Sequence, residues 1–192
     1  MGQHSIVPGA DVSQSRCIVH FTDWLPTLLA MTGADRPGGM PLDGGNVLPL
    51  LRGDSSLEAP KRFWQWNGYS PIGACNAAMR DGPWKLVRPQ IGMRAATPAA
   101  AALMARYVEQ DIAYKRDPDS VTQMTEPEPQ RIVDPAPPAE LYHIEADPSE
   151  ADDLAQAQPK RVSRMLADLE TWFERVESDR QQVAVENLVD PE

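Results

Sequence analysis

Cysteine, long apolar runs and an apolar N-terminal segment are scarce or missing in this 192-residue sequence. Its two cysteines, Cys17 and Cys75, form no CxxC pair and have apolar or small neighbours, so buried free thiols are favoured over a disulfide. No apolar run is long enough to cross a bilayer, and MGQHSIVPGADV at the start has no basic segment followed by an apolar one. We therefore expect no membrane span and no signal peptide in this chain, and a cytoplasmic location if Met1 is the native start.

Basic residues are also in short supply. The chain has 18 Lys and Arg against 28 Asp and Glu, for a formal charge of −10, and residues 139–192 alone hold 14 acidic against 5 basic side chains. No basic patch remains that would bind nucleic acid. We interpret the acidic excess as a solvated helix rather than as a specific binding surface.

What the chain does contain is typical of a globular protein with long irregular segments, because 42% of its residues are apolar and 19 are proline. In its first third, Cys17–Phe21 has the composition of a short strand, and Thr22 offers a hydroxyl N-cap for a helix over Asp23–Thr32. Gly33 is the expected end of that helix. Asn46–Leu51 predicts about one further helical turn.

Beyond residue 61 the apolar pattern changes from the period of a helix to that of a strand. Arg62–Trp66 predicts a strand, and Asn76–Arg88 predicts a hairpin in which Asp81-Gly82 supplies the positive φ values of a tight turn. Glu140–Ile144 predicts a further strand that joins the hairpin. We therefore expect a small antiparallel sheet.

Two helices are expected around that sheet. Pro98–Lys115 predicts a helix inside an Ala- and Pro-rich surface insertion, and the prolines at 127–138 predict no regular structure after it. Pro159 begins a longer helix, and the tail from Asp179 onward is expected to fray. The apolar side chains of the longer helix form one stripe that would cover the sheet: Val162, Met165, Leu166, Leu169, Trp172, Phe173 and Val176.

Four segments together resemble the sulfatase family of the alkaline-phosphatase superfamily, over about residues 8–180. Their sequences are TDWLPTLL (Thr22–Leu29), LDGGNVLPLLRG (Leu42–Gly53), AMRDGPWKLV (Ala78–Val87) and ELYHIEADPSEADDLA (Glu140–Ala155). They are similar, in order and separation, to the family patterns hTDLLPTLL, DGxxLLPLLxG, AxRxGxWKLV and ELYDLxxDPxExxNLA.

The resemblance implies an α+β fold made of two parts. Residues 1–60 would be the C-terminal end of the large α/β catalytic domain of a sulfatase. Residues 61–180 would be a C-terminal subdomain, a small antiparallel sheet packed against a long C-terminal helix, with the insertion at about 89–138. Residues 181–192 would be a frayed tail.

The chemistry of the family needs groups that this chain does not supply. Sulfatases convert a Cys or Ser in a Cys/Ser-x-Pro-x-Arg motif to formylglycine, and neither Cys17 nor Cys75 is followed by the required Pro and Arg. They also hold a divalent cation, commonly calcium, with oxygen ligands. Asp152-Asp153 matches a structural turn of the family instead, so we expect a solvated or capping pair there. We therefore predict no catalytic residue, no metal site and no cofactor in this chain.

The histidines do not alter that prediction. His4, His20 and His143 are isolated from one another and from any nucleophile-like serine, and no Ser-His-Asp arrangement can be inferred from their spacing. We expect His20 and His143 at strand edges with partly buried rings.

A contribution to substrate binding is the remaining role that the resemblance implies, because C-terminal subdomains of the family lean over the substrate cleft. Trp66, Asn67 and Tyr69 follow the first predicted strand, where an aromatic ring and an amide could contact the organic part of a sulfate ester. Trp64 and Trp66 could instead be core residues, and for Trp64 we favour the core.

Two functions remain in competition. In the first, the chain is the C-terminal part of a sulfatase, inactive alone, whose partner is a missing N-terminal half. In the second, it is a noncatalytic module that associates, with itself or with that half, through an apolar helix face containing Trp24, Leu25, Leu28 and Leu29.

Overall fold

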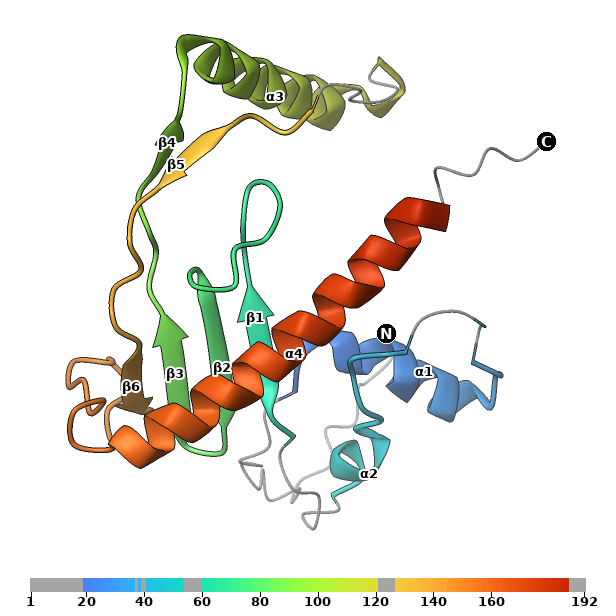
Figure 1. Ribbon diagram of the computed structural model, residues 1–192. Helices are drawn as coiled ribbons and strands as arrows, with labels where there is room; N and C mark the ends of the chain where they lie inside the picture. Colours follow the sequence, from blue (N-terminus) through green and yellow to red (C-terminus); the bar gives the residue numbers. More distant parts are fainter. Residues whose placement is uncertain (1–18, 37, 39–40, 54–59, 121–126, 187–192) are drawn as a thin grey trace, which may run out of the picture. The chain divides into compact units, whose positions relative to one another are not determined.

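The computed structural model of this chain describes residues 19–36, 38, 41–53, 60–120 and 127–186, and divides it into two compact units (Figure 1). The first unit ends at Arg62 and the second begins at Phe63. Cys17 and His4 lie outside the described residues. Helices and antiparallel strands together confirm the predicted α+β class. The prediction that the first unit is the end of a sulfatase catalytic domain stays a prediction.

The described part of the first unit contains a 3₁₀ turn η1 (Phe21–Asp23), helix α1 (Trp24–Thr32) and helix α2 (Leu48–Leu51). Gly33 ends α1 with a φ of 69°, as predicted, and α2 lies inside the predicted turn. The prediction of a strand up to Phe21 is wrong for the described residues 19–21. His20 instead caps η1, and its backbone N–H donates to the Asp23 carboxylate at 2.7 Å, which turns the chain directly into the helix.

Thr22 does not have the capping role that the sequence predicted. The side chains that connect the segments of the first unit are those of Asp23 and Thr27. The Asp23 carboxylate is fully buried and accepts hydrogen bonds from Gly45 N–H at 2.8 Å and from the Arg62 guanidinium at 2.6 Å. Thr27 Oγ1 accepts from the buried Val47 N–H at 3.0 Å. Two of the segments that carry the family resemblance are therefore joined by polar side chains of the first and backbone N–H groups of the second.

Glycine 44 permits this close approach. A Cβ atom at Gly44 would lie 1.9 Å from the backbone oxygen of Thr22, well inside van der Waals contact. The chain from 43 to 47 therefore passes against η1 only because this position has no side chain.

The second unit contains a four-stranded sheet in the order β1 (Arg62–Gln65), β2 (Ala77–Asp81), β3 (Trp84–Arg88), β6 (Glu140–His143). β2 and β3 form the predicted hairpin, and β6 pairs antiparallel with β3 as predicted. The turn differs by one residue from the prediction. Asp81 pairs with Trp84 inside the ladder, so Gly82 and Pro83 form the two-residue loop and Gly82 alone supplies the positive φ, 56°.

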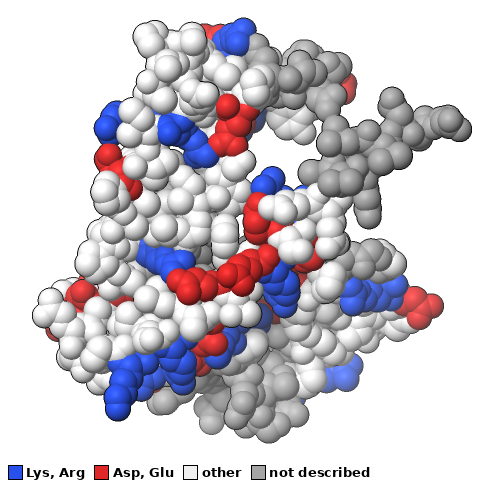
Figure 2. All heavy atoms as spheres, in the orientation of Figure 1, with Lys and Arg blue, Asp and Glu red and all other residues white. Residues whose placement is uncertain are grey.

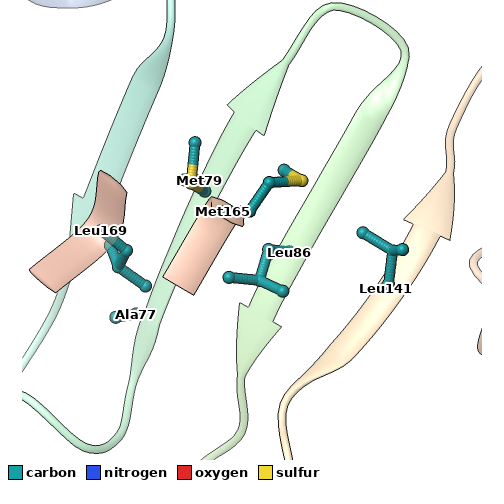
Figure 3. Close-up of a cluster of buried hydrophobic side chains, with 6 residues drawn as sticks. All are labelled: Ala77, Met79, Leu86, Leu141, Met165 and Leu169. Atoms are coloured by element: carbon teal, nitrogen blue, oxygen red, sulfur yellow. The ribbon is translucent and has the colours of Figure 1, made fainter. Parts of the chain in front are cut away.

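The long helix α4 (Pro159–Glu186) crosses one face of this sheet (Figure 1). Figure 3 shows the cluster that results, in which side chains from β2, β3, β6 and α4 point toward one another: Ala77, Met79, Leu86, Leu141, Met165 and Leu169. Burial of each larger member stabilises the fold by about 1.5–3 kcal/mol. The expected stripe on α4 therefore covers the sheet, and helix propensity alone would not hold it there.

Around this cluster, charged side chains of α4 pair with the hairpin. Arg164 bonds Asp81 at 2.9 Å, Arg88 bonds Glu170, and the Arg161 guanidinium lies 4.2 Å from the centroid of the Trp84 ring. Figure 2 shows blue and red side chains next to one another on the face drawn there. The helix continues to residue 186, and fraying of the tail stays a prediction.

Between β3 and β6 the chain forms what we call the arm, residues 93–120 and 127–133. It contains β4 (Met93–Ala95), α3 (Pro98–Arg116), η2 (Pro118–Ser120) and β5 (Arg131–Val133), and β4 pairs antiparallel with β5. Figure 1 shows the two strands leading from the sheet to α3. The predicted helix is present, with the Thr97 hydroxyl as its N-cap. The prediction of no regular structure among the prolines at 127–138 is wrong, because β5 forms there. The strand lies in the run from 130 to 134, which contains no proline.

No helix among the described residues is both long and apolar enough to span a membrane.

Candidate functional site

The three residues predicted to contact substrate lie in the loop between β1 and β2, residues 66–76, which we call the β1–β2 loop. Trp66 directly follows β1, and its backbone N–H donates to Asn76 O at 3.0 Å, so its backbone continues the pairing with β2. Its indole is 76% exposed. The alternative that Trp66 is a core residue is therefore wrong.

Trp64 is not part of the core cluster either. Adjacent strand residues point to opposite faces of a sheet. In β1 it is Phe63 that faces the cluster, where its ring stacks on Trp172 with centroids 5.3 Å apart, while Trp64 is half-buried outside it. The prediction that favoured the core for Trp64 was wrong by one residue.

The C-terminal half of the loop is fixed to the sheet and to α4. Gln65 Nε2 and Cys75 N–H both donate to the backbone oxygen of Ile72, at 2.9 and 3.2 Å, and the Arg88 guanidinium donates to Gly73 O. A Cβ atom on Gly73 would lie 3.0 Å from the Phe173 ring, so the chain here is pressed against α4.

The N-terminal half of the loop is held by the arm. The Tyr69 ring meets the Tyr107 ring of α3 edge to face, with centroids 5.6 Å apart and an interplanar angle of 87°. The guanidinium carbon of Arg131, the first residue of β5, lies 5.0 Å from the Tyr69 centroid. Tyr69 is therefore a structural contact of the arm, whatever else it touches.

The side-chain amide of Asn67 is buried without making hydrogen bonds to the described residues. Both its Nδ2 and Oδ1 atoms are buried, and neither has a hydrogen-bond partner among the described residues. A buried polar group without a partner costs about 1–3 kcal/mol. This is the kind of position at which a polar ligand group binds favourably once it can reach the amide.

The described residues do not suit the two groups that sulfatase chemistry needs, a cysteine or serine that becomes formylglycine and a bound cation. Cys75 is fully buried and unpaired, as predicted for a free thiol, and burial raises its pKa while the charge of Arg131 acts in the opposite direction. A buried, protonated thiol outside a Cys/Ser-x-Pro-x-Arg motif does not suit conversion to formylglycine.

The Asp152-Asp153 pair does not suit a cation. Asp153 Oδ1 accepts from the backbone N–H groups of Leu141 and Ala155, both at 2.9 Å, which is the predicted capping role. Among the described ranges, no group of three or more His, Cys, Asp or Glu residues could hold a metal ion.

The two described histidines have local contacts. His143 ends β6, half-buried and edge-on to Trp84 with centroids 4.7 Å apart, as expected for a strand edge. His20 is half-buried but precedes η1 rather than a strand, and its Nδ1 lies 2.9 Å from Thr22 Oγ1. Neither is near the β1–β2 loop in the sequence.

Sequence reasoning missed the arm's part in this site. Tyr107, Glu128 and Arg131 all contact the loop, yet Arg131 and Ser70 are 61 residues apart in the chain. The arm was expected to be a surface insertion, and no local pattern indicates which surface such an insertion will contact.

Comparisons with known proteins complete the description. No family model matches the chain. One similar solved structure is a Bacteroides thetaiotaomicron protein designated 6S-sulf, described in connection with the metabolism of multiple glycosaminoglycans. It shares 20% identity over 81% of this chain with a TM-score of 0.40, and the match covers 24% of that protein. The chain thus spans about a quarter of the length of this neighbour.

Proposed function

We propose that this chain is the C-terminal part of a sulfatase-family hydrolase acting on sulfate esters, and that it holds neither the nucleophile nor the metal site of the reaction. The observation that carries the proposal is the contact between two of the family-like segments. Asp23 of the TDWLPT segment receives Gly45 N–H, and Thr27 receives Val47 N–H. Two side chains that make the TDWLPT segment recognisable thus bind the backbone of the LDGGNV segment, which packing of unrelated segments would not require.

In such an enzyme this chain would complete the fold and shape the substrate cleft. Trp66 would offer its exposed ring to the organic part of the ester, with Asn67 and Tyr69 beside it in the same loop. The formylglycine residue and the oxygen ligands of the calcium ion would both belong to another segment, which carries the Cys/Ser-x-Pro-x-Arg motif. When bound, that calcium would stabilise charge on the sulfate oxygens.

The test is an assay of the purified chain with para-nitrophenyl sulfate and added calcium. We expect no turnover from the chain alone and turnover when a separately produced sulfatase N-terminal segment with a formylglycine residue is added. Hydrolysis by the chain alone would contradict the missing nucleophile. An in-frame Cys/Ser-x-Pro-x-Arg coding sequence upstream of Met1 would support the proposal independently.

A second candidate function rests on a different observation, the exposed apolar face of the first unit. The large side chains of Phe21, Trp24, Leu25, Leu28 and Met31 are all exposed, although each is apolar. Contiguous apolar surface of this kind typically marks an association site. In this alternative the chain is a noncatalytic module that self-associates through α1.

Sedimentation over a range of protein concentrations distinguishes the alternatives. Self-association that Leu28→Asp abolishes, together with no complementation in the sulfate assay, would favour the module. A concentration-independent monomer that complements would favour the sulfatase.

A further inference from the structure

Arg131 connects two segments that are distant in the sequence. Its side chain is only 10% exposed, and its guanidinium lies over the Tyr69 ring and within 3.4 Å of the backbone oxygen of Ser70. It also forms an ion pair with Glu128. Because a guanidinium is planar and has five N–H donors, it can stack on a ring and bond two acceptors at once.

Glu128 makes the second connection from the arm to the loop. Its carboxylate accepts the Ser70 backbone N–H at 3.3 Å and also the Ser70 hydroxyl. The Arg131–Glu128 pair therefore holds Ser70 through its N–H, its hydroxyl and its carbonyl. Tyr107 of α3 supports Tyr69 from the side.

These contacts divide the β1–β2 loop into two halves with different supports. The half containing Ile72 and Gly73 is bonded to the sheet and packed on α4. For the half containing Tyr69 and Ser70, the contacts described above all come from the arm. Loss of the arm contacts would thus free Asn67–Ser70, while Trp66 stays bonded to Asn76 and the sheet stays intact.

We propose that Arg131 is a positioning residue that fixes Tyr69 and the rest of the Asn67–Ser70 segment in their observed conformation. The arm then acts as an element that shapes the candidate substrate-binding loop, rather than as an inert surface insertion. Only the link to substrate rests on the proposed function. The ordering of the loop by Arg131 does not.

Cys75 provides a native reporter of that order. It is the last residue but one of the loop, is fully buried and forms no disulfide, and Arg131 lies close enough for its charge to act on the pKa of the thiol. A thiol reagent therefore reaches Cys75 only when the loop and the Arg131 side chain move apart. The experiment follows the reaction of Cys75 with 5,5′-dithiobis(2-nitrobenzoic acid) in the full chain, with Cys17→Ser to remove the other thiol. We expect Arg131→Ala to accelerate this reaction roughly tenfold or more, the factor that corresponds to about 1.4 kcal/mol of opening free energy.

An increase in the reaction rate of Cys75 in Arg131→Ala has one interpretation, because the change in charge acts on the thiol in the opposite direction. Burial raises the pKa of Cys75 and the charge of Arg131 acts against that rise, so removing the charge would by itself raise the pKa further and slow the reaction. A faster reaction therefore reports exposure and not electrostatic activation.

Matched variants separate positioning from general destabilisation. Arg94 lies on β4 of the same arm and pairs with Asp134 at 2.8 Å, but both are exposed, so Arg94→Ala should leave the rate unchanged. Glu128→Gln should give an intermediate rate, because the Ser70 bonds weaken while Arg131 stays over Tyr69. Arg131→Lys should rescue only in part, because a lysine cannot stack and bond two acceptors in the same way.

The outcomes are distinct. If Arg131→Ala reacts no faster than Arg94→Ala, or if hydrogen exchange shows that the β2–β3 hairpin opens as much as the loop, the proposal is overturned. In a complemented enzyme, Arg131→Ala should raise KM for para-nitrophenyl sulfate and leave kcat near its original value. A positive thiol result without any complemented activity would refute the proposed function alone.

Discussion

Replacing Thr27 by valine removes one buried hydrogen bond with almost no change in side-chain size. Thr27 is fully buried on α1, and its hydroxyl oxygen accepts the N–H of Val47, which is 5% exposed, at 3.0 Å. Valine keeps both branches of the side chain and its β-branched shape, so no cavity term is added. What remains is a buried amide without an acceptor.

The magnitude follows from that unpaired amide. An unsatisfied buried donor costs about 1–3 kcal/mol, which corresponds to an increase of about 5- to 150-fold in the local opening equilibrium. Hydrogen exchange at the Val47 amide, followed by NMR, measures this directly. We expect Thr27→Val to accelerate exchange at Val47 within that range and Thr27→Ser, which keeps the hydroxyl, to preserve most of the protection.

Thr32 on the same helix is the matched control. Its hydroxyl donates to Leu28 O at 2.9 Å, but the residue is exposed, so Thr32→Val should change stability by no more than about 0.5 kcal/mol. Equal exchange at Val47 in Thr27→Val and in the unaltered chain would refute the reasoning. So would an equal effect from Thr32→Val.

Three further predictions follow from the same structure. Asp23→Ala leaves the Arg62 charge buried without its 2.6 Å partner and should destabilise the first unit by about 3–5 kcal/mol, measured as loss of amide protection in α1. Leu86→Ala removes the fully buried centre of the sheet cluster and should cost about 2–5 kcal/mol in urea unfolding followed by tryptophan fluorescence. The backbone N–H of Asp152 lowers the pKa of Asp147 below 3.8, so the stability gained from that carboxylate is present above pH 3.8 and is lost as the pH falls through the folded-state value. Asp147→Ala should therefore reduce the melting temperature at neutral pH and have less effect in acid.

Each of these has its own control. A double change with Arg62→Met should recover part of the loss from Asp23→Ala, and no recovery would argue against loss of the Asp23–Arg62 pair as the cause. Leu51→Ala, at an exposed position, should be nearly neutral, and a cost equal to that of Leu86→Ala would contradict the role of the cluster. Asp152→Ala keeps the donor N–H, so a pH-dependent loss as large as that of Asp147→Ala would show that the wrong carboxylate was assigned.

Much of the second unit could be predicted from the sequence because its signals are local. The alternation in Arg62–Gln65, the glycine at the hairpin turn and the apolar stripe of α4 each express the period of one element, and each element forms where expected. The boundaries that failed depended on contacts outside the element. His20 precedes a 3₁₀ turn because Asp23 binds its backbone, and β5 forms because β4 lies beside it.

The candidate site shows the same division. Sequence position alone brought Trp66, Asn67 and Tyr69 together, since they are neighbours in one loop. It could not specify that Trp66 is exposed, that the Asn67 amide is buried or that Tyr69 is covered by Arg131. The cover on Tyr69 depends on which surface a distant insertion contacts.

The amino-acid sequence by itself determined the α+β class, the helix on the sheet and the absence of a Cys/Ser-x-Pro-x-Arg motif, because periodicity and motifs are properties of adjacent residues. The tertiary structure alone decided that Asp23 bonds Arg62, and that Arg131 bonds Ser70. Such contacts form between side chains 39 and 61 positions apart, and only the folded backbone brings them within bonding distance.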